Sequence, residues 1–425
     1  MKKFLLGLFC AIVVDAFFWD FVLNIFPIAN SKMILAAFGI VAFVIQCFKE
    51  HTLSLSRRVS FSAFLALLFS AWCYIAITIN NTNDTTYVTY IISFITWVGG
   101  AYGAVTLLRL VHDRVDLMLI TRYLAIICVA QCIIALLIDN VPAVESLVKR
   151  VFLQGYDFYE RDHRLYGIGC ALDPAGIRFS AVLVLIAHQL AIENRVRENL
   201  AKTGFLFIAY SIITVIGCMI ARTTMVGALL GIVFIIWGSF KIQADGYISR
   251  LQVGFTLLLL FLIGSAVGIS VYLYNTSDTF HYNLRFGFEG FFNWVETGEF
   301  RTHSTDILMN TMWIWPDDPR GWLIGYGRYG LFEWNTDIGY CNFVLYCGLI
   351  GLTIYSFYYI FNHLSLIGRF HRFAFTALLL TAITFIVWAK VATDIFLVDA
   401  LLFCIDPDPD SREGRLLNAV QSASS

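Results

Sequence analysis

Long apolar runs recur along almost the whole chain and are separated by short polar segments. A membrane-spanning helix needs about 20 predominantly apolar residues, and this pattern predicts about eleven or twelve of them, the last one weak. The expected spans are 4–26, 32–48, 60–79, 87–108, 117–138, 174–192, 203–221, 223–240, 252–274, 338–361, 372–390 and 391–405. We therefore predict an all-α polytopic membrane protein with one domain over residues 1–405, followed by a disordered polar tail at 406–425.

The interpretation of two of these runs as membrane helices needs further argument. The stretch from Thr203 to Phe240 is almost continuously apolar. At about 1.5 Å per residue it is too long for one crossing of a hydrocarbon core about 30 Å thick. We therefore expect a turn between Ala221 and Thr224, where Arg222 interrupts the run. The N-terminal run resembles a signal peptide, but it lacks a convincing cleavage site, so we predict a retained first helix.

Lysines and arginines near the span ends fall mostly on one side of the membrane, which the positive-inside rule assigns to the cytoplasm. The opposite side then receives two longer polar segments, at about 139–173 and 275–337. Both carry basic residues against the rule: Lys149, Arg150, Arg161, Arg164, Arg285, Arg301, Arg320 and Arg328. Anion binding is the first explanation for cations in these positions. We expect an outward-facing cavity beneath the two extracytoplasmic segments.

The composition narrows the class of protein further. The chain is 59% hydrophobic and 14% charged, with a mean hydropathy of +0.74, whereas soluble domains are about 25% charged. The net charge of -1 suggests no nucleic-acid partner. The short cytoplasmic loops hold no Walker A motif, and no GxGxxG motif follows a predicted strand. This excludes an ATP-driven pump built on one chain and disfavours a nucleotide-sugar donor. We expect no metal and no cofactor.

The segment 139–173 ends in a charged, aromatic stretch that contains Arg164 and leads to Asp173 and Pro174. Asp173 suits a helix N-cap and Pro174 suits the first helical turn. Arg178 lies one turn deeper on the same helix, where snorkelling to the interface is an alternative to anion binding. Arg222 has the same two interpretations. It is either an interfacial anchor or a guanidinium that binds phosphate through two parallel hydrogen bonds.

The segment 275–337 is the richest in candidate chemistry. Arg301, His303 and Asp306 lie near its middle, and Asp337 lies where the chain re-enters the membrane. Its tryptophans either stack on sugar faces or form an interfacial belt; they are Trp294, Trp313, Trp315, Trp322 and Trp334. Further charged residues lie inside or beside apolar runs and are either functional or helix-packing groups: Asp15, Asp20, Lys390, Asp394 and Asp399. The spacing of Lys390 and Asp394 permits an ion pair on one helix.

Several motifs follow one another in a recognisable order between about residues 160 and 355. They are Arg164-x-x-Gly167 with Asp173-Pro174, an Ala-Arg-Thr turn at Arg222, Arg301 in a long outer loop, Gly325-x-Gly327, and a Gly-Leu-Ile-Gly-Leu helix at 348–352. In this order the chain resembles the bacterial O-antigen polymerase and ligase superfamily, the Wzy-like integral membrane glycosyltransferases. Members join lipid-diphosphate-linked glycans in the outer leaflet.

This resemblance implies a polymerase of lipid-linked oligosaccharide repeat units in the bacterial inner membrane, with its active site facing the periplasm. The donor would be a polyprenyl-diphosphate-linked oligosaccharide. A chain-length regulator and a flippase are further candidate partners. By position, Arg164, Arg222 and Arg301 would neutralise the departing diphosphate, and Arg178 is a further candidate. A ligase usually has a His-Asn pair where this chain has 337–342, DIGYCN, which favours a polymerase.

Two questions stay open at this stage. The acceptor hydroxyl loses a proton as it attacks, and Asp337 or His303 could receive it; a mechanism without a dedicated base is also possible. A flippase or transporter of lipid-linked oligosaccharide is the alternative from another class. A transporter should place charge along a path through the membrane, whereas most of the unusual charge here is predicted at the outer face.

Overall fold

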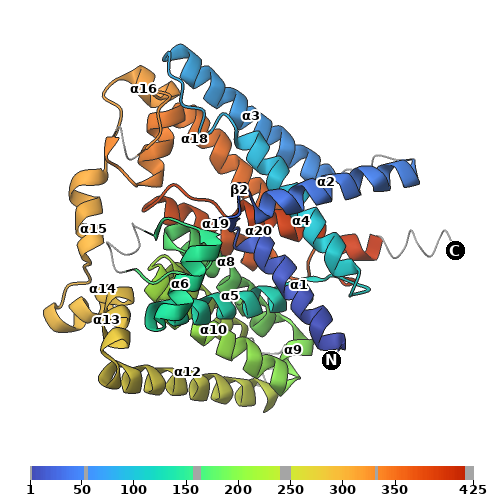
Figure 1. Cartoon of the computed structure of the whole chain (residues 1–425), viewed down its shortest axis with the longest axis vertical. Coiled ribbons are helices and arrows are strands. Elements are labelled where there is room, and N and C mark those ends of the chain that lie inside the picture. Colours follow the sequence, from blue (N-terminus) through green and yellow to red (C-terminus); the bar gives the residue numbers. More distant parts are fainter. Residues whose placement is uncertain (1, 52–55, 157–163, 240–249, 331–333, 417–425) are drawn as a thin grey trace. The chain divides into compact units, whose positions relative to one another are not determined.

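The computed structural model describes the chain except for residues 1, 52–55, 157–163, 240–249, 331–333 and 417–425 (Figure 1). The described residues are predominantly helical, and their strands are limited to one small sheet. The all-α expectation is therefore confirmed. The chain divides into two compact units: unit 1 comprises Met1–Asn30 and Met118–Phe300, and unit 2 comprises Ser31–Leu117 and Arg301–Ser425.

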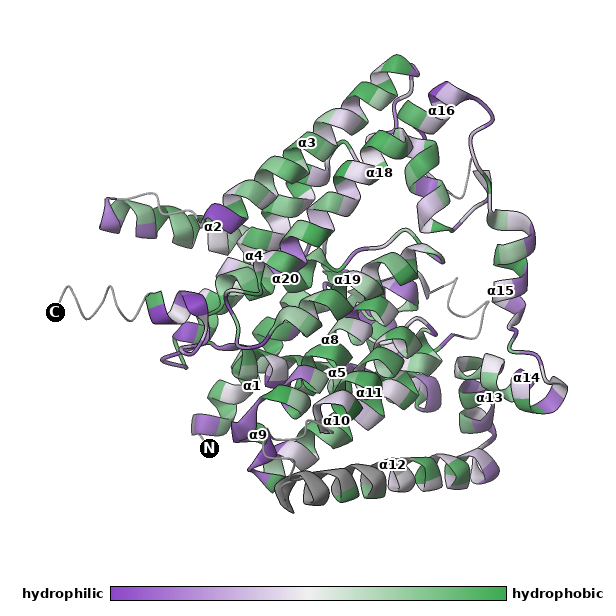
Figure 2. Ribbon diagram, turned by 180° about the vertical axis from the view of Figure 1, so that it is seen from behind, coloured by the Kyte–Doolittle hydropathy of each residue, from purple (hydrophilic) through white to green (hydrophobic). Residues whose placement is uncertain are grey.

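Seven helices among the described residues are long and apolar enough to cross a membrane. They are α2 (Ser31–Glu50), α3 (Arg57–Ile79), α4 (Tyr90–Arg109), α5 (Leu117–Asn140), α8 (Leu172–Ile192), α10 (Leu200–Ile220) and α18 (Gly339–Ser365). Two shorter apolar helices are α11 (Thr224–Ser239) and α19 (Ala374–Trp388). Hydrophobic residues predominate on these helices, and hydrophilic residues gather at helix ends and in connections (Figure 2). This pattern is what a multi-pass membrane protein requires.

Unit 1 is built around α8, almost all of whose residues are buried. Its other helices are α1 (Lys2–Phe18), α5, α6 (Pro142–Val151), α9 (Asn194–Arg197), α10, α11, α12 (Arg250–Thr276), α13 (Asp278–Gly287) and α14 (Glu289–Thr297). Helices α10 and α11 pack against α8. A Cβ atom on Gly227 of α11 would lie 2.2 Å from the Cα of Ser180 on α8. This approach of two backbones explains why α11 has no side chain at that point.

The first predicted span is wrong beyond Phe18. Helix α1 ends there, and the chain forms the short strands β1 (Val22–Leu23) and β2 (Phe26–Asn30). These strands pair antiparallel, and β1 also pairs with β3 (Phe152–Leu153) in a sheet of order β2-β1-β3. The predicted hairpin turn is confirmed, because α10 ends at Ile220 and α11 begins at Thr224. The Thr223 carbonyl accepts a hydrogen bond of 2.9 Å from the Ser180 hydroxyl, which fixes this turn to α8.

Unit 2 contains α2, α3, α4, α18 and α19 together with shorter helices. These are α15 (His303–Ile307), a π-helical turn at Leu308–Met312, α16 (Pro319–Ile324) and α20 (Phe396–Cys404). Helix α18 lies between α3 and α16 (Figure 1). Helices α2 and α4 contact each other closely through Gly39, Gly99 and Gly103. Small residues at this contact allow two membrane helices to approach without a hydrophobic driving force.

Helix α18 is interrupted at Gly348, which has a φ of 67°. The interruption removes carbonyls from the helical ladder, and an unsatisfied carbonyl is costly at membrane depth. The backbone N–H groups of Tyr326 and Gly327 donate to the carbonyls of Leu345 and Tyr346, at 2.6 and 3.0 Å. The indole of Trp72 on α3 donates to the Cys347 carbonyl at 2.8 Å. The glycine element at 325–327 therefore has a structural role in completing a broken helix.

The segment 406–416, which we expected to belong to a disordered tail, makes specific contacts within unit 2. Asp406 pairs with Arg109 at 2.8 Å. Glu413 pairs with Arg58 at 2.5 Å and with Arg369 at 2.8 Å. The acidic residues of this segment thus neutralise arginines at the ends of membrane helices. Residues 417–425 lie outside the described part of the chain.

Candidate functional site

Two of the predicted arginines come together in unit 1. The guanidinium of Arg222 lies over the ring of Phe286 at 4.2 Å from its centroid, and that of Arg164 lies over the same ring at 5.7 Å. Phe286 belongs to α13, whereas Arg164 precedes α8 and Arg222 lies between α10 and α11. The aromatic ring attracts both cations, so it holds two like charges near each other. The predicted grouping of Arg164 with Arg222 therefore has a physical basis.

Arg222 is held in a fixed orientation. Its Nε donates to the Phe286 carbonyl at 2.9 Å, and its Nη2 lies 2.6 Å from Glu289 Oε2. The side chains of Arg222 and Glu289 are 20% and 23% exposed. Burial lowers the pKa of the Arg222 guanidinium, and the positive charge of Arg164 lowers it further, while the carboxylates of Glu289 and Asp173 act in the opposite direction. An arginine stays charged at any physiological pH, so the site is a half-buried, oriented cation.

Asp173 does not cap its own helix as predicted. The N-cap of α8 is Ala171, without a side-chain capping bond. Asp173 Oδ1 instead accepts a hydrogen bond of 3.0 Å from the Thr223 hydroxyl, in the turn that carries Arg222. The acidic residue therefore contributes to the position of the arginine turn. This contact joins residues 50 positions apart and could not be read from local sequence.

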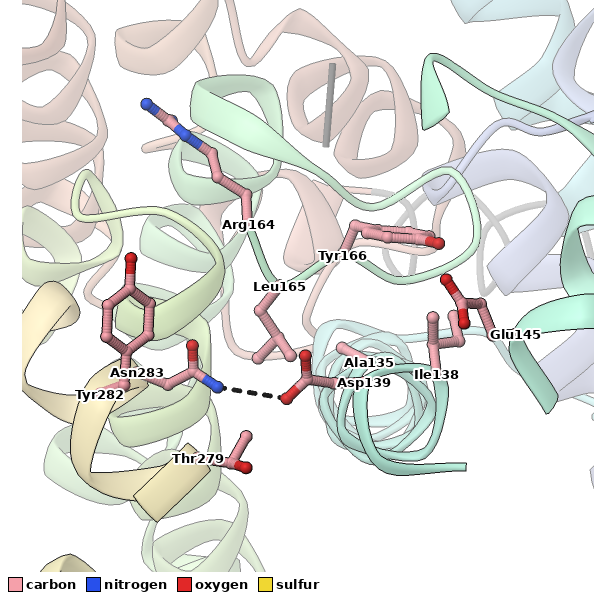
Figure 3. A pocket seen from close by; sticks show the side chains of 10 residues that line it. All are labelled: Ala135, Ile138, Asp139, Glu145, Arg164, Leu165, Tyr166, Thr279, Tyr282 and Asn283. Carbon is pink, nitrogen blue, oxygen red and sulfur yellow. Dashed lines mark hydrogen bonds between the residues drawn. The ribbon is translucent and has the colours of Figure 1, made fainter. Parts of the chain in front are cut away.

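A cavity of about 580 Å³ lies beside the arginines within unit 1. Its lining comes from α5, α6, the residues before α8, and α13: Ala135, Ile138, Asp139, Glu145, Arg164, Leu165, Tyr166, Thr279, Tyr282 and Asn283. The amide of Asn283 faces the carboxylate of Asp139 and donates to it at 3.3 Å (Figure 3). The Arg164 side chain extends away from Asp139 (Figure 3). The volume lies within the range of about 300–1,000 Å³ that small-molecule sites occupy.

One face of α13 connects the cavity to the arginines. Thr279, Tyr282 and Asn283 line the cavity, and Phe286 contacts the arginines. Residues three and four apart share one face of a helix, so these four side chains form a continuous stripe. Gly287 then lies against the backbone of Cys218 on α10, where an added Cβ would be 3.0 Å from the Cys218 carbonyl. This close contact holds the C-terminal end of α13 in place.

Arg178, the fourth predicted phosphate ligand, makes a structural contact in unit 1. Its Nη1 donates to the Phe18 carbonyl at the end of α1, at 2.5 Å, and its Nη2 lies 2.9 Å from Asp20 Oδ1. The Arg178 guanidinium also lies over the Trp19 ring. A cation at a helix C-terminus interacts favourably with the helix dipole. Arg178 therefore joins α8 to the end of α1, whatever its role toward a ligand.

The remaining predicted residues belong to unit 2. Arg301 Nε lies 3.1 Å from Asp306 Oδ1, and both side chains are substantially exposed. His303 is exposed at the start of α15, the short helix that follows the Thr302 N-cap. Unit 2 thus brings Arg301, His303 and Asp306 into one local segment. Glu160 to His163, which precede Arg164, fall outside the described residues.

Asp337 is exposed just before α18. Burial raises the pKa of Tyr329, and the negative charges of Asp337 and Asp84 raise it further, whereas a hydrogen bond with Tyr87 lowers it. Asp84 also accepts a hydrogen bond of 2.6 Å from the Tyr329 backbone N–H. Asp337 therefore shares its surroundings with a second carboxylate.

Sequence reasoning missed the residues that complete these contacts. Phe286, Glu289 and Asp139 gave no local signal, since an aromatic and two acidic residues in polar segments are common. Lys390 and Asp394 do not share a helix as predicted, because α19 ends at Trp388 and α20 begins at Phe396. No family model, curated protein or solved structure matches this chain in comparisons of its sequence and fold.

Proposed function

We propose that this protein is an integral membrane glycosyltransferase that polymerises lipid-linked oligosaccharide repeat units. The observation that carries the proposal is the pair of arginines on Phe286, next to a cavity with a polar lining. The order of motifs shared with the O-antigen polymerases supports the same reaction. The proposal places the site on the periplasmic face of a bacterial inner membrane, with eleven or twelve spans by the count of apolar runs.

The reaction needs an anion site more than any other feature. The donor's anomeric carbon is bonded to a polyprenyl diphosphate, which leaves with the electron pair of that bond while an acceptor hydroxyl forms the new glycosidic bond. Negative charge grows on the diphosphate as it departs, and positioned guanidinium groups stabilise that charge. Arg164 and Arg222, which share the ring of Phe286, would do this as a pair.

Arg222 suits this role because of its present partner. A lone guanidinium near the bilayer costs several kcal/mol, and Glu289 compensates that charge at 2.6 Å. A diphosphate carries more negative charge than one carboxylate and presents several acceptor oxygens. It can therefore compete with Glu289 for the guanidinium, through bidentate bonds that a lysine cannot make.

The direct test uses purified protein in detergent with lipid-linked repeat units. We expect a ladder of glycans, resolved by gel electrophoresis. Arg222→Gln and Arg164→Gln should lower the rate by at least about 100-fold, a loss typical of removing one charge-stabilising donor. Arg222→Lys should rescue poorly. The matched control is Arg195→Gln, since Arg195 is exposed on α9. Full activity of Arg222→Gln and Arg164→Gln would contradict the proposed anion site.

A flippase or transporter of lipid-linked oligosaccharide is the second candidate. The interruption of α18 at Gly348 favours it, because discontinuous helices often form the binding sites of transporters. The same preparation distinguishes the two functions. Transport in liposomes without a ladder would assign the second function. Transfer of glycan to a different lipid acceptor, again without a ladder, would identify a ligase.

A further inference from the structure

The cavity in unit 1 has two carboxylates in its described lining, and they lie apart from the arginine that the lining shares with the arginine pair (Figure 3). Asp139 and Glu145 line the cavity, and Arg164 is the one arginine among the described residues of its lining. The Arg164 side chain extends away from Asp139, toward neither carboxylate of the lining (Figure 3). A diphosphate placed beside Asp139 and Glu145 would be repelled. The cavity is therefore better suited to an uncharged, hydroxyl-rich group than to the diphosphate.

The polar groups of the lining fit sugar hydroxyls. Besides the two carboxylates, they include the amide of Asn283 and the hydroxyls of Thr279 and Tyr282. Carboxylates accept, amides both donate and accept, and hydroxyls do either. A sugar ring presents hydroxyls that can satisfy all of them, while the apolar residues of the lining can contact its C–H faces. Such a mixture of apolar surface and few polar groups is typical of a small-molecule site.

We propose that this cavity binds the acceptor sugar and that Asp139 receives the proton of the attacking hydroxyl. This inference rests on the proposed glycosyl transfer. The hydroxyl oxygen forms a bond to the anomeric carbon of the donor, and the bond from that carbon to the diphosphate oxygen breaks. The hydroxyl proton moves to the Asp139 carboxylate, and the electron pair leaves with the lipid diphosphate. Atoms and charge balance without a further reactant.

The surroundings of the two carboxylates distinguish Asp139 from Glu145. Glu145 Oε1 forms an ion pair of 2.9 Å with Lys149, one turn along α6. Asp139 Oδ2 accepts a hydrogen bond from Asn283, whose side chain is almost fully buried. A neutral amide holds the carboxylate in one orientation without cancelling its charge. Asp139 therefore combines basicity with a fixed position, as a general base requires.

The stripe on α13 links this base to the leaving-group site. Asn283 orients Asp139, and Phe286 on the next turn holds the two arginines. Consecutive turns of a helix are about 5.4 Å apart. One rigid element thus positions the groups that act on the nucleophile and on the leaving group. A displacement of α13 would affect both halves of the reaction together.

The test measures transfer from the lipid-linked donor to a fluorescent repeat-unit glycan without a lipid diphosphate. Asp139→Asn should lower kcat by about 100-fold or more, within the usual range for loss of a general base, with the donor KM unchanged. Thr279→Trp, at an exposed position of the lining, should raise the KM for the free glycan about tenfold without changing the donor KM. Thermal unfolding in detergent verifies that both variants fold.

The matched control is Asp278→Asn, because Asp278 is an exposed carboxylate on α13 outside the lining. If wild-type protein transfers glycan and Asp139→Asn does so at the same kcat, Asp139 is not the base, although the proposed function stands. An unchanged KM for the free glycan in Thr279→Trp would place the acceptor elsewhere. If wild-type protein transfers no glycan under any condition, the proposed function fails and this inference fails with it.

Discussion

Substitutions of Arg178 and of its partner Asp20 can decide whether Arg178 stabilises the fold or binds a ligand. Its guanidinium lies 2.9 Å from Asp20 and 2.5 Å from the Phe18 carbonyl. The side chains of Arg178 and Asp20 are 12% and 18% exposed. Replacing Arg178 by methionine keeps the alkyl stem but leaves a largely buried carboxylate without its cation. Asp20→Asn leaves the converse defect, a largely buried guanidinium without its carboxylate.

The expected magnitude follows from this burial. Removing one partner of a fully buried pair costs about 3–5 kcal/mol, whereas an exposed pair contributes about 0–1 kcal/mol. Because Arg178 and Asp20 are not fully buried, we expect each single substitution to lower the free energy of unfolding by about 2–4 kcal/mol. The Arg178→Met/Asp20→Asn double variant removes both charges. We expect its free energy of unfolding to return to within about 1 kcal/mol of wild type, since replacing both members of a buried pair is often nearly neutral.

Two measurements on the single and double variants test this expectation. The free energy of unfolding is obtained by titrating the detergent-solubilised protein with sodium dodecyl sulfate, and polymerisation is followed as the glycan ladder. If Arg178 serves the fold, activity should recover with stability in the double variant. A double variant that is stable but inactive would refute this reasoning and assign Arg178 to the diphosphate. So would an inactive Arg178→Met variant of wild-type stability.

Three further predictions address other parts of the chain. Trp72→Phe removes the indole donor to the Cys347 carbonyl in unit 2 and should lower the free energy of unfolding by about 1–3 kcal/mol; an unchanged unfolding curve would show that another donor replaces it. Reporter fusions at the exposed residues Asn83 and Thr297 should both report the extracytoplasmic side, and a cytoplasmic signal at Thr297 would overturn the proposed topology. Asp337→Asn should polymerise at nearly the wild-type rate if Asp139 is the base, whereas an inactive Asp337→Asn with partial activity in Asp337→Glu would assign the proton transfer to Asp337.

Sequence reasoning succeeded where length and periodicity set narrow limits. The run from Thr203 to Phe240 had to contain a turn, because one helix of that length would exceed the bilayer, and the turn lies at the predicted place. The same reasoning failed between Val22 and Asn30. An apolar stretch satisfies a helix or a strand equally well, and here pairing with Phe152–Leu153, far along the chain, supports the strands.

Only some residues of the candidate site could be predicted from the sequence. Arg164 and Arg222 stood out because basic residues were unexpected in those positions. Phe286 did not, since its contact with Arg222 joins residues 64 positions apart. Asp139 looked like a residue at the end of a membrane helix, and only the fold shows that Asn283 faces it. Single residues can reveal an unusual charge, but long-range contacts decide what compensates that charge.

The way the charges are compensated suggests how such a site can be both stable and reactive. Arg222 and Glu289 neutralise each other in the absence of a ligand, so the half-buried guanidinium does not carry an uncompensated charge. The ring of Phe286 lowers the repulsion cost of holding Arg164 nearby, because both cations face its negative π-surface. In the proposed reaction, an incoming diphosphate would compete with Glu289 for a guanidinium that is already oriented. Little reorganisation would then be needed as negative charge developed on the leaving group, and such preorganisation is a main source of electrostatic stabilisation in enzymes.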